Sequence, residues 1–527
     1  MKNIEQKSTS LGIELGSTRI KAMLVGPGGE VLASGAHDWE NRFENGYWTY
    51  RLEDVWAGVQ DACRDLMENY RAAFGQPLRQ VGALGVSAMM HGYLPFDADG
   101  RLLTAFRTWR NTTTQPAAEE LTDRFGFNIP QRWSIAHLYQ AMKNGEEHVR
   151  DVAFLTTLAG YVHWQLTGEK VLGVGDASGV FPIDSATCDY NAAMMASFDE
   201  LLEQAEMPWR LADILPQVRC AGQDAGCLTE AGARLLDPTG TLQPGAPVCP
   251  PEGDAGTGMA ATNTVEPGTG NVSAGTSIFA MVVLEKPLQK VYPEIDLVTT
   301  PDGAPVAMVH CNNCTSDLNA WVGLFGQVAA LCGAPCEPDK LYPLLFGASL
   351  EGAPDCGGLT PVNYYSGEGV THFDAGRPLL LRSPQSSLSL PELMRAHIYS
   401  AMATLKIGLD LLRQEQVPMK RLLAHGGLFK TPGVAQRYLA AAAQAPVTVM
   451  QTAGEGGPYG MALLAAYRRA VLEGSSLSLV EYLQQQIFAG AEGTTLTPEP
   501  ADAQGFEAFL ERYKAALPAE RAAVEYF

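Results

Sequence analysis

Two glycine-rich turns about 260 residues apart constrain the fold of this chain more than any other feature. The first, Gly16-Ser17-Thr18, separates the apolar runs Leu11–Leu15 and Ile20–Val25, and the second, Gly275-Thr276-Ser277, separates two similar runs. A short apolar run, a glycine turn and a second run indicate a β-hairpin. Because the spacing is half the chain and too long for a short-period repeat, we expect two related α/β domains facing each other across a cleft. Small ligands usually bind in clefts of this kind.

Each turn also has a chemical implication. Successive backbone N–H groups and hydroxyls in a Gly-Ser/Thr turn can bind phosphate oxygens, although the same residues suit an ordinary hairpin. Two facing turns could therefore hold the β- and γ-phosphates of a nucleotide. The sequence has no Gly-Lys dipeptide and no His-Arg-Asp, which excludes a Walker A loop and the protein-kinase motifs.

Alternating helix and strand patterns follow both turns. Apolar periodicity predicts a helix over Leu52–Phe74, a strand over Gln80–Ala88 and a long helix over Pro391–Glu415. Further expected elements are helices at Gln115–Phe125, Ile135–Asn144, Leu158–Leu166, Val434–Gln444, Pro458–Glu473 and Phe506–Tyr526, and strands at Val31–Ser34, Val306–His310, Arg421–His425 and Val447–Gln451. The pattern supports an α/β fold.

Charge and targeting signals limit the partners and the compartment. The chain has 37 Lys and Arg residues and 58 Asp and Glu residues, which gives it a formal net charge of −21. Because an acidic surface repels phosphate backbones and anionic lipids, we expect neither nucleic acid nor a membrane as a partner. Residues 1–10 are polar and no apolar signal segment follows them. We therefore expect a cytoplasmic protein whose ten cysteines are reduced.

Four of these cysteines have a spacing that resembles a zinc site. Cys311 and Cys314 are followed by Cys332 and Cys336, close to the pattern of a four-thiolate metal centre. The alternative is a set of free thiols flanking a helix over Asp317–Leu331, which is apolar enough to belong to the core. The sequence favours free thiols.

Four motifs in order resemble the FGGY carbohydrate kinases, a family with the actin-like, ribonuclease-H-like ATPase fold. They are Gly12-Ile13-Glu14-Leu15-Gly16-Ser17-Thr18, Gly253-Asp254-Ala255-Gly256-Thr257-Gly258, Gly275-Thr276-Ser277 and His425-Gly426-Gly427-Leu428-Phe429-Lys430. The resemblance implies two actin-like domains facing across a cleft. It places an N-terminal domain at residues 1–264, a C-terminal nucleotide-binding domain at 265–490, and a C-terminal helix or tail at 491–527.

Within the family, Met89-Met90-His91-Gly92 and Asp176-Ala177-Ser178-Gly179 are most similar to the xylulokinase branch. Three departures put the identity of the sugar in doubt. One is the segment Cys311–Trp321, in which Thr315-Ser316-Asp317 with Trp321 is faintly nearer to ribulokinases. Glu14 stands where the family has Asp, and its carboxylate reaches about 1.5 Å further, one C–C bond. Trp109-Arg110-Asn111 replaces the family's Trp-Asn-Asp.

The resemblance assigns a role to each candidate residue. Asp254 is the expected catalytic base, and Glu14 with Asp254 is expected to hold Mg²⁺. Met90, His91, Gly92, Arg110 and Asp254 are expected to bind the acceptor sugar. The residues expected to bind ATP are Gly16, Ser17, Thr18, Gly275, Thr276, Gly426, Gly427 and Lys430.

The expected reaction is transfer of the γ-phosphoryl group of Mg-ATP to a hydroxyl of a ketopentose, with xylulose favoured. A kinase for ribulose, fuculose, a polyol or an aldonate is the first alternative. An actin-like nucleotide-binding protein without a sugar acceptor is the second, and a relative that lost activity through Glu14 is a weaker third. The sequence leaves a homodimer open.

Overall fold

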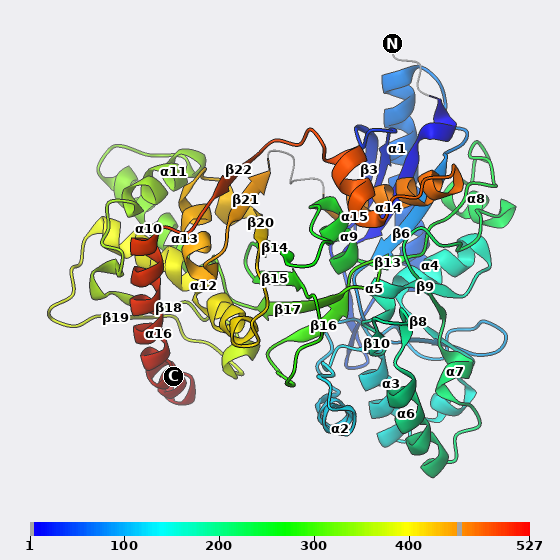
Figure 1. Ribbon diagram of the computed structural model, residues 1–527, viewed down its shortest axis with the longest axis horizontal. Helices are drawn as coiled ribbons and strands as arrows, with labels where there is room; N and C mark the ends of the chain where they lie inside the picture. The colour runs from blue at the N-terminus through cyan, green and yellow to red at the C-terminus, as the bar shows by residue number, and fades with distance from the viewer. Residues whose placement is uncertain (1–4, 451–455) are drawn as a thin grey trace. The chain divides into compact units, whose positions relative to one another are not determined.

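The computed structural model describes residues 5–450 and 456–527 and divides into two compact α/β units (Figure 1). Unit 1 comprises residues 1–266, 297–306 and 455–490, and unit 2 comprises 267–296, 307–454 and 491–527. The segment 455–490, placed by the sequence in the C-terminal domain, thus packs with unit 1, and the expected tail 491–527 packs with unit 2. The chain returns to unit 1 twice after leaving it.

A five-stranded sheet with the order β13-β6-β1-β2-β3 forms the centre of unit 1. Its strands, in that order, are Glu252–Gly253, Ala83–Ala88, Ser10–Leu15, Arg19–Val25 and Val31–Asp38. β13, β6 and β1 run parallel, whereas β2 and β3 complete an antiparallel meander. Ala88 is in register with both Leu15 and Gly253. The three parallel strands therefore end together at one edge of the sheet.

Helices cover both faces of this sheet. Apolar residues of β1 such as Ile13 share a core with α1 (Leu52–Phe74). On the opposite face, Gly12 lies against α14 (Gly456–Leu472) so closely that a Cβ there would come within 2.2 Å of the Pro458 carbonyl oxygen. Because strand side chains alternate between faces, Glu14 is on the side that α14 covers.

A seven-stranded sheet, most of whose residues belong to unit 2, has the order β16-β17-β15-β14-β20-β21-β22. Its strands, in that order, are Asp296–Thr299, Pro305–Cys311, Ile278–Val283, Thr269–Ala274, Arg421–His425, Val447–Met450 and Gly493–Leu496. β14 pairs with β15 as a hairpin and runs parallel to β20, with Ser273 opposite His425. Each unit thus has a hairpin flanked on one side by parallel strands, as the two similar turns predicted.

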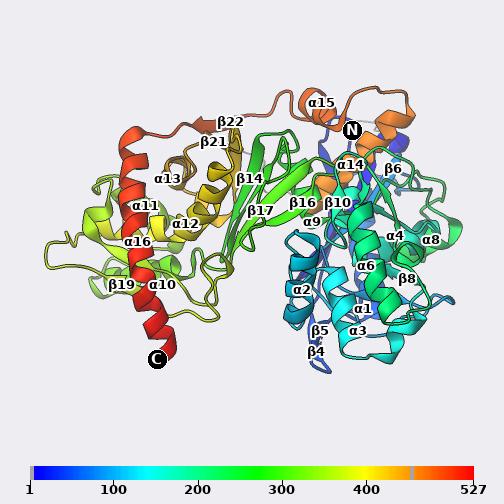
Figure 2. The same cartoon turned by 60° about the horizontal axis from the view of Figure 1, so that its bottom comes forward.

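The other elements lie around these sheets. In unit 1 they are β4 (Arg42–Glu44), β5 (Tyr47–Thr49), β7 (Leu94–Phe96), α2 (Gln115–Phe125), α3 (Ser134–Lys143), β8 (Phe154–Thr156), α4 (Leu158–Thr167), β9 (Val171–Gly173), α5 (Val174–Ala177), β10 (Ile183–Asp184), β11 (Asp189–Tyr190), α6 (Ala192–Gln204), α7 (Leu211–Ile214), β12 (Gln217–Arg219), α8 (Glu230–Leu236), α9 (Asp254–Ala261) and α15 (Leu479–Tyr482). In unit 2 they are α10 (Ser316–Leu331), α11 (Pro338–Ser349), β18 (Thr360–Val362), β19 (Leu379–Leu381), α12 (Leu390–Gln414), α13 (Val434–Ala443) and α16 (Pro500–Tyr526). Figure 2 shows α16 running beside α12 and α13.

Most predicted elements are present, with small differences at their ends. The strand predicted at Val447–Gln451 is β21, and Gln451 lies outside the described residues. The helix predicted at 317–331 forms as α10, but the prediction that it belongs to the core is wrong, because only Asp317, Leu318 and Val322 are buried. No helix in the described part of the chain is long and apolar enough to cross a membrane.

Candidate active site

Asp254 lies at the edge of the sheet where β6 and β13 end, at the start of α9. Its Oδ1 accepts a hydrogen bond of 3.1 Å from the backbone N–H of Met90, which follows β6. The side chain is open to solvent, but nearby protein atoms displace part of its hydration, which raises the pKa of Asp254, while the N–H groups of Met90 and Ala255 lower it. The topology thus joins the expected base to the segment expected to bind the acceptor.

Glu14 is the second carboxylate at this edge. Burial and the nearby charge of Asp254 raise the pKa of Glu14 to about 7, although Lys21 lowers it. Its carboxylate contacts the first turn of α14, since a Cβ on Gly457 would lie 1.8 Å from Glu14 Oε1. Glycine at position 457 therefore makes room for the Glu14 side chain.

Glu14 and Asp254 together suit Mg²⁺. Among residues 5–450 and 456–527, no three His, Cys, Asp or Glu side chains lie close enough to hold an ion. A pair of carboxylates without a third protein ligand fits a cation that keeps several waters and shares phosphate oxygens. Burial and, to a smaller extent, repulsion by Asp254 raise the pKa of Glu14, and a divalent cation bound between the two carboxylates would relieve that repulsion.

Beneath Asp254 are two buried acids that the sequence-based site did not include. Asp176 Oδ2 accepts the Thr157 hydroxyl at 2.6 Å, and its backbone N–H donates to Glu252 Oε2 at 3.0 Å. Burial, and to a smaller extent the charge of Asp254, raise the pKa of Asp176 to about 7 against the opposing Thr157 bond. Burial and Asp176 likewise raise the pKa of Glu252 well above its usual value. Motif spacing gives no signal for this pair because its members are 76 residues apart.

His91 is buried beside this edge and has a left-handed backbone, with φ of 70°. Burial and the charge of Arg132 lower its pKa well below the usual range, so the imidazole is neutral. Nδ1 lies 3.3 Å from the Gly179 carbonyl oxygen, which requires the proton to be on Nδ1. Nε2 is therefore an acceptor suited to a sugar hydroxyl.

The first glycine turn has its carbonyl groups fixed by the protein. Trp39 Nε1 donates to the Gly16 carbonyl at 2.7 Å, and the Tyr50 hydroxyl donates to the Ser17 carbonyl at 2.6 Å. The N–H groups of Ser17 and Thr18 have no protein acceptor within the described ranges. The turn therefore presents donors, as phosphate binding requires.

In unit 2 the expected nucleotide residues meet at the ends of β14 and β20. The Gly275 carbonyl accepts bonds from the N–H and hydroxyl of Thr315, at 3.2 and 2.7 Å. Gly426, with φ of 105°, lies so close that a Cβ would come within 2.2 Å of the Ala274 carbonyl oxygen. Gly427 and Lys430 follow on the exposed side. The parallel pairing of β14 with β20 thus brings Gly275, Thr276, Gly426 and Gly427 to one edge.

One other sequence-based candidate, Arg110, is engaged with other side chains of unit 1. The Arg110 guanidinium stacks 3.9 Å above the Trp48 ring and donates to Asn41 Oδ1 at 2.9 Å. Arg132, which the sequence did not single out, is the arginine whose charge acts on both His91 and Asp254.

The four cysteines considered as a zinc site do not share one environment. Cys311 and Cys314 are buried, Cys336 is half-buried, and Cys332 is exposed beyond the end of α10. None of them belongs to a metal-holding group in the described part of the chain. The structure gives the zinc hypothesis no support.

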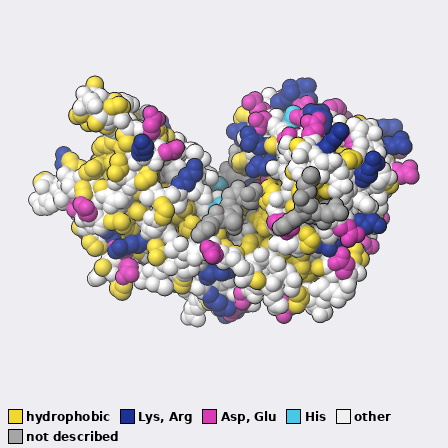
Figure 3. Space-filling view, turned by 90° about the horizontal axis from the view of Figure 1, so that it is seen from above, with side chains coloured by type: hydrophobic (Ala, Val, Ile, Leu, Met, Phe, Trp, Pro, Cys, Tyr) yellow, Lys and Arg dark blue, Asp and Glu magenta, His cyan; other side chains and the backbone are white. Residues whose placement is uncertain are grey.

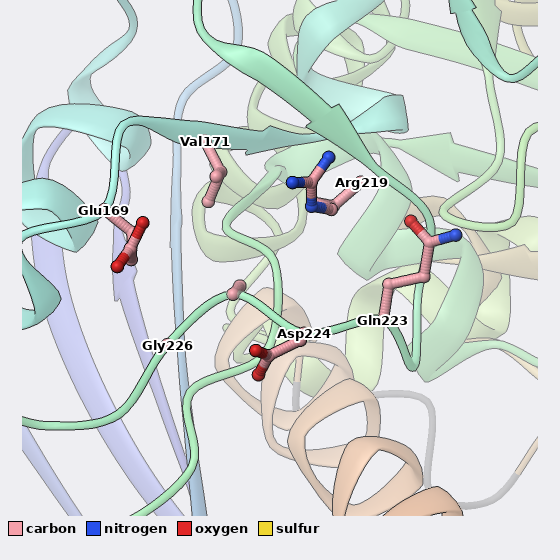
Figure 4. Close-up of a pocket in the computed structure, with 7 residues that line it drawn as sticks. Glu169, Val171, Arg219, Gln223, Asp224 and Gly226 are labelled. Carbon is pink, nitrogen blue, oxygen red and sulfur yellow. The ribbon is translucent and has the colours of Figure 1, made fainter.

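A polar pocket of about 430 Å³ lies away from these residues in unit 1 (Figure 4). Its lining includes Glu169, Arg219, Gln223 and Asp224, none of which the sequence assigned to the site. Asp224 is also held by Arg468 of α14 at 2.6 Å. This pocket is separate from the carboxylates at the sheet edge.

Comparison with known proteins identifies the family of this chain. The model of the N-terminal domain of the FGGY family of carbohydrate kinases matches residues 9–255, and that of the C-terminal domain matches residues 270–469. A xylulose kinase of Haemophilus influenzae is 22% identical over 66% of this chain and 68% of its own length. A ribulokinase of Bacillus licheniformis is 22% identical over 83% of this chain and 81% of its own. The crystal structure of a gluconate kinase from Lactobacillus acidophilus has a TM-score of 0.78 at 17% identity, covering 97% and 98% of the two chains.

Proposed function

The chain belongs to the FGGY family of carbohydrate kinases, and from that premise we propose that it transfers the γ-phosphoryl group of Mg-ATP to a hydroxyl of a ketopentose, xylulose first. The family assignment confirms the resemblance and the expected α/β kinase fold. The observation that most supports the proposed chemistry is the hydrogen bond from Met90 to Asp254. It holds the expected base against the segment expected to bind the acceptor.

Asp254 acts as the base in this proposal. Its Oδ1 is held by Met90, so Oδ2 is the oxygen that accepts the proton of the acceptor hydroxyl. The N–H groups at the start of α9 stabilise the carboxylate form. Phosphoryl transfer requires mainly positioning and charge neutralisation, and a fixed carboxylate orients the hydroxyl for in-line attack.

His91 positions the acceptor. Its neutral ring offers Nε2 to a second sugar hydroxyl, because Nδ1 is committed to the Gly179 carbonyl. Gly92, with φ of 102°, lies so close to Phe106 that a Cβ would come within 2.7 Å of the ring. A larger residue at position 92 would therefore displace the segment on which His91 lies.

Each glycine turn, taken by itself, offers contacts suited to a nucleotide. Ser17 and Thr18 offer N–H and hydroxyl donors to phosphate oxygens, and Thr276 offers the same groups in unit 2. Gly426 and Gly427 have no side chain, so the adenosine can contact the backbone there directly. Lys430, also expected to bind ATP, follows three residues later. Mg²⁺, when bound, would neutralise phosphate charge, and Glu14 and Asp254 would hold it.

Arg132 favours a second candidate function, phosphorylation of an aldonate. Its charge acts on both His91 and Asp254, and its carbonyl accepts the Gly92 N–H at 3.3 Å. A cation beside the expected acceptor is unnecessary for a neutral sugar but would pair with a sugar carboxylate.

A panel of acceptors separates the two candidates. We expect kcat/KM for D-xylulose to exceed kcat/KM for ribulose, fuculose, glycerol and gluconate by at least about tenfold. A tenfold ratio corresponds to a difference of ~1.4 kcal/mol in binding free energy. ADP release coupled to a reporter enzyme measures each rate. If gluconate is instead the best acceptor, the aldonate candidate replaces xylulose.

Arg132→Leu tests the cause of that preference. Loss of a charge-paired hydrogen bond costs at least ~2 kcal/mol, about 30-fold, so an aldonate kinase would lose gluconate activity selectively. A xylulose kinase would change similarly for all acceptors. ATP turnover that is the same with and without every acceptor would favour the nucleotide-binding protein without a sugar.

Glu14→Gln is expected to raise the Mg²⁺ concentration needed for half-maximal rate by about 10–100-fold. In the wild type that concentration should rise as the pH falls below about 7, because protons then compete for the Glu14 carboxylate. The glutamine variant should lose this pH dependence. Magnesium titrations at pH 6 and pH 8 measure both effects.

The exposed carboxylate of Glu40 provides the matched control, and Glu40→Gln should behave as wild type.

Glu14→Asp tests whether glutamate is adapted to this site. A large loss shows that the longer side chain is the fitted ligand, whereas a faster enzyme supports partial decay from the family's Asp.

A further inference from the structure

Two cysteines of unit 1 that are distant in the sequence lie side by side. Cys188 ends the turn between β10 and β11, with a left-handed φ of 52°, and Cys220 directly follows β12. A Cβ placed on Gly303 would lie 2.5 Å from Cys188 Sγ and 3.9 Å from Cys220 Sγ, so both sulfurs flank one backbone position. Both thiols are free and half-buried. They are therefore within reach of each other and of solvent.

The two sulfurs differ in their chemistry. Burial, followed by the hydrogen bond that the Cys220 thiol donates to Cys188 and the charge of Cys188, raises the pKa of Cys220 above its usual value. Cys220 therefore keeps its proton, and Cys188 is the acceptor. Because a thiolate is the reactive form of cysteine, Cys188 is suited to attack an oxidant. Cys220 then has the position of a resolving thiol.

The turn between β16 and β17 packs against both cysteines. This turn belongs to unit 1. Cys188 Sγ lies 3.9 Å from the Asp302 carbonyl oxygen. The N–H of Ala221, the residue after Cys220, donates to the Pro301 carbonyl at 2.7 Å. A displacement of either cysteine would therefore be passed to this turn.

The same turn packs against α9, which begins at Asp254. A Cβ on Gly256, two residues after Asp254, would come within 3.2 Å of Pro301 Cγ. The Thr299 hydroxyl, at the start of the turn, donates to the Val174 carbonyl of α5 at 3.0 Å. The turn thus connects the two thiols to the helix that carries the expected base.

We propose that Cys188 and Cys220 form a reversible disulfide on reaction with a peroxide, and that this bond slows phosphoryl transfer at Asp254. The second part rests on the proposed function. Sulfurs that already contact each other can be joined without large backbone movement. Closing the bond draws them together, however, and the turn packed against Cys188 has to follow.

The reaction balances in two steps. The Cys188 thiolate attacks one peroxide oxygen, the O–O bond breaks, and the hydroxide released takes up the proton that Cys188 gave to solvent. Cys220 Sγ then attacks the sulfenic sulfur of Cys188, and the hydroxyl group leaves as water with the Cys220 proton. The two thiols lose two electrons in all, and the peroxide is reduced to two waters.

An uncharged oxidant suits this protein better than an anionic one. The formal charge of the chain is −21, and Figure 3 shows Asp and Glu side chains scattered over the surface among Lys and Arg. A surface of this net charge repels anions such as glutathione disulfide. Hydrogen peroxide is neutral and small enough to reach a half-buried sulfur, so it is the probe for the test.

Mass spectrometry of the full-length protein treated with a small molar excess of hydrogen peroxide tests for the bond. After alkylation and digestion, the peptides that carry Cys188 and Cys220 should be linked, and dithiothreitol should separate them. Cys220→Ser should leave Cys188 as a sulfenic acid that dimedone traps, whereas Cys188→Ser should leave Cys220 reduced. Peptides that stay unlinked in the oxidised wild type overturn the proposal, as does equal trapping of the two cysteines in these variants.

ADP release in the presence of the acceptor measures the consequence for the reaction. Oxidation should lower the wild-type kcat at least about tenfold, since misplacing a reacting group by ~1 Å can cost about 10²-fold, and dithiothreitol should restore it. Cys188→Ser should keep its rate under peroxide. A linked wild type that keeps its full rate overturns the effect on Asp254, as does a Cys188→Ser enzyme that is inactivated equally.

Cys227→Ser is the matched control, because Cys227 is an exposed cysteine elsewhere in unit 1. This variant should form the Cys188–Cys220 bond and lose activity as the wild type does. The linkage is read by mass and needs no turnover. A protein that forms the bond but phosphorylates no acceptor when reduced would therefore support the disulfide and contradict the proposed function alone.

Discussion

Asp254→Asn is expected to lower kcat by about 10²–10⁴-fold with every acceptor, the usual contribution of a positioned base. The amide retains the size of the side chain and can still accept the Met90 N–H bond. It cannot take a proton from the acceptor hydroxyl, and it removes one of the two charges proposed to hold Mg²⁺. The KM for the acceptor should change less than kcat, because His91 and the loop around it are unaltered. Steady-state assays at saturating Mg²⁺ separate the two quantities.

Asp123→Asn is a suitable control, since Asp123 is exposed on α2, away from the sheet edge. It should keep full activity. An Asp254→Asn enzyme that retains more than about a tenth of the wild-type kcat would contradict the assignment of the base. Sugar-independent ATP hydrolysis that survives the substitution unchanged would point to the actin-like alternative instead.

Asp502→Ala is expected to destabilise unit 2 by about 3–5 kcal/mol, the cost of leaving a buried charge without its partner. Asp502 and Arg395 side chains are 1% and 2% exposed and form an ion pair that also includes Arg437. Arg395 would keep bonds to the Tyr399 hydroxyl and the Gly352 carbonyl, but neither carries a compensating charge. Urea unfolding followed by fluorescence should show an earlier transition.

The same ion pair predicts a dependence on acid. Burial would raise the pKa of Asp502, but the bonds from Arg437 and Arg395 outweigh it and hold the pKa below its usual value. This contribution is therefore complete above about pH 4, the unfolded value, and is lost as the pH falls through the folded value. Lys514→Ala, which removes an exposed pair with Glu511, should change stability by less than ~1 kcal/mol. Equal effects of the two variants would contradict the role of burial.

Elements with a strong local pattern could be predicted from the sequence. The helix Leu52–Phe74 has an apolar face and ends at Gly75, whose φ of 71° suits a left-handed cap. The hairpins around Gly16 and Gly275 were equally clear. Local periodicity and turn chemistry were enough in these cases.

Features that depend on distant packing could not be predicted. Both faces of β1 are covered, so the sequence alone could not tell which face carries Glu14. The packing of Gly12 against α14 and the contact of Gly457 with Glu14 settle it in the structure. The pairing of Asp176 with Glu252 likewise depends on a two-residue strand that has almost no local signal. The apolar α10 was expected to be buried because hydrophobicity measures a preference for burial and does not reveal whether a neighbour is present.

The late position of α14 in the chain has a consequence for biosynthesis. The helix covers the sheet face that carries Gly12, Gly85 and Met23, yet it follows β1 by more than 440 residues. While the ribosome is still making the intervening segment, that face lacks its cover and presents bare backbone and apolar groups to the cell. The first half of unit 1 therefore cannot complete its packing until α14, in the last seventh of the polypeptide, has been made.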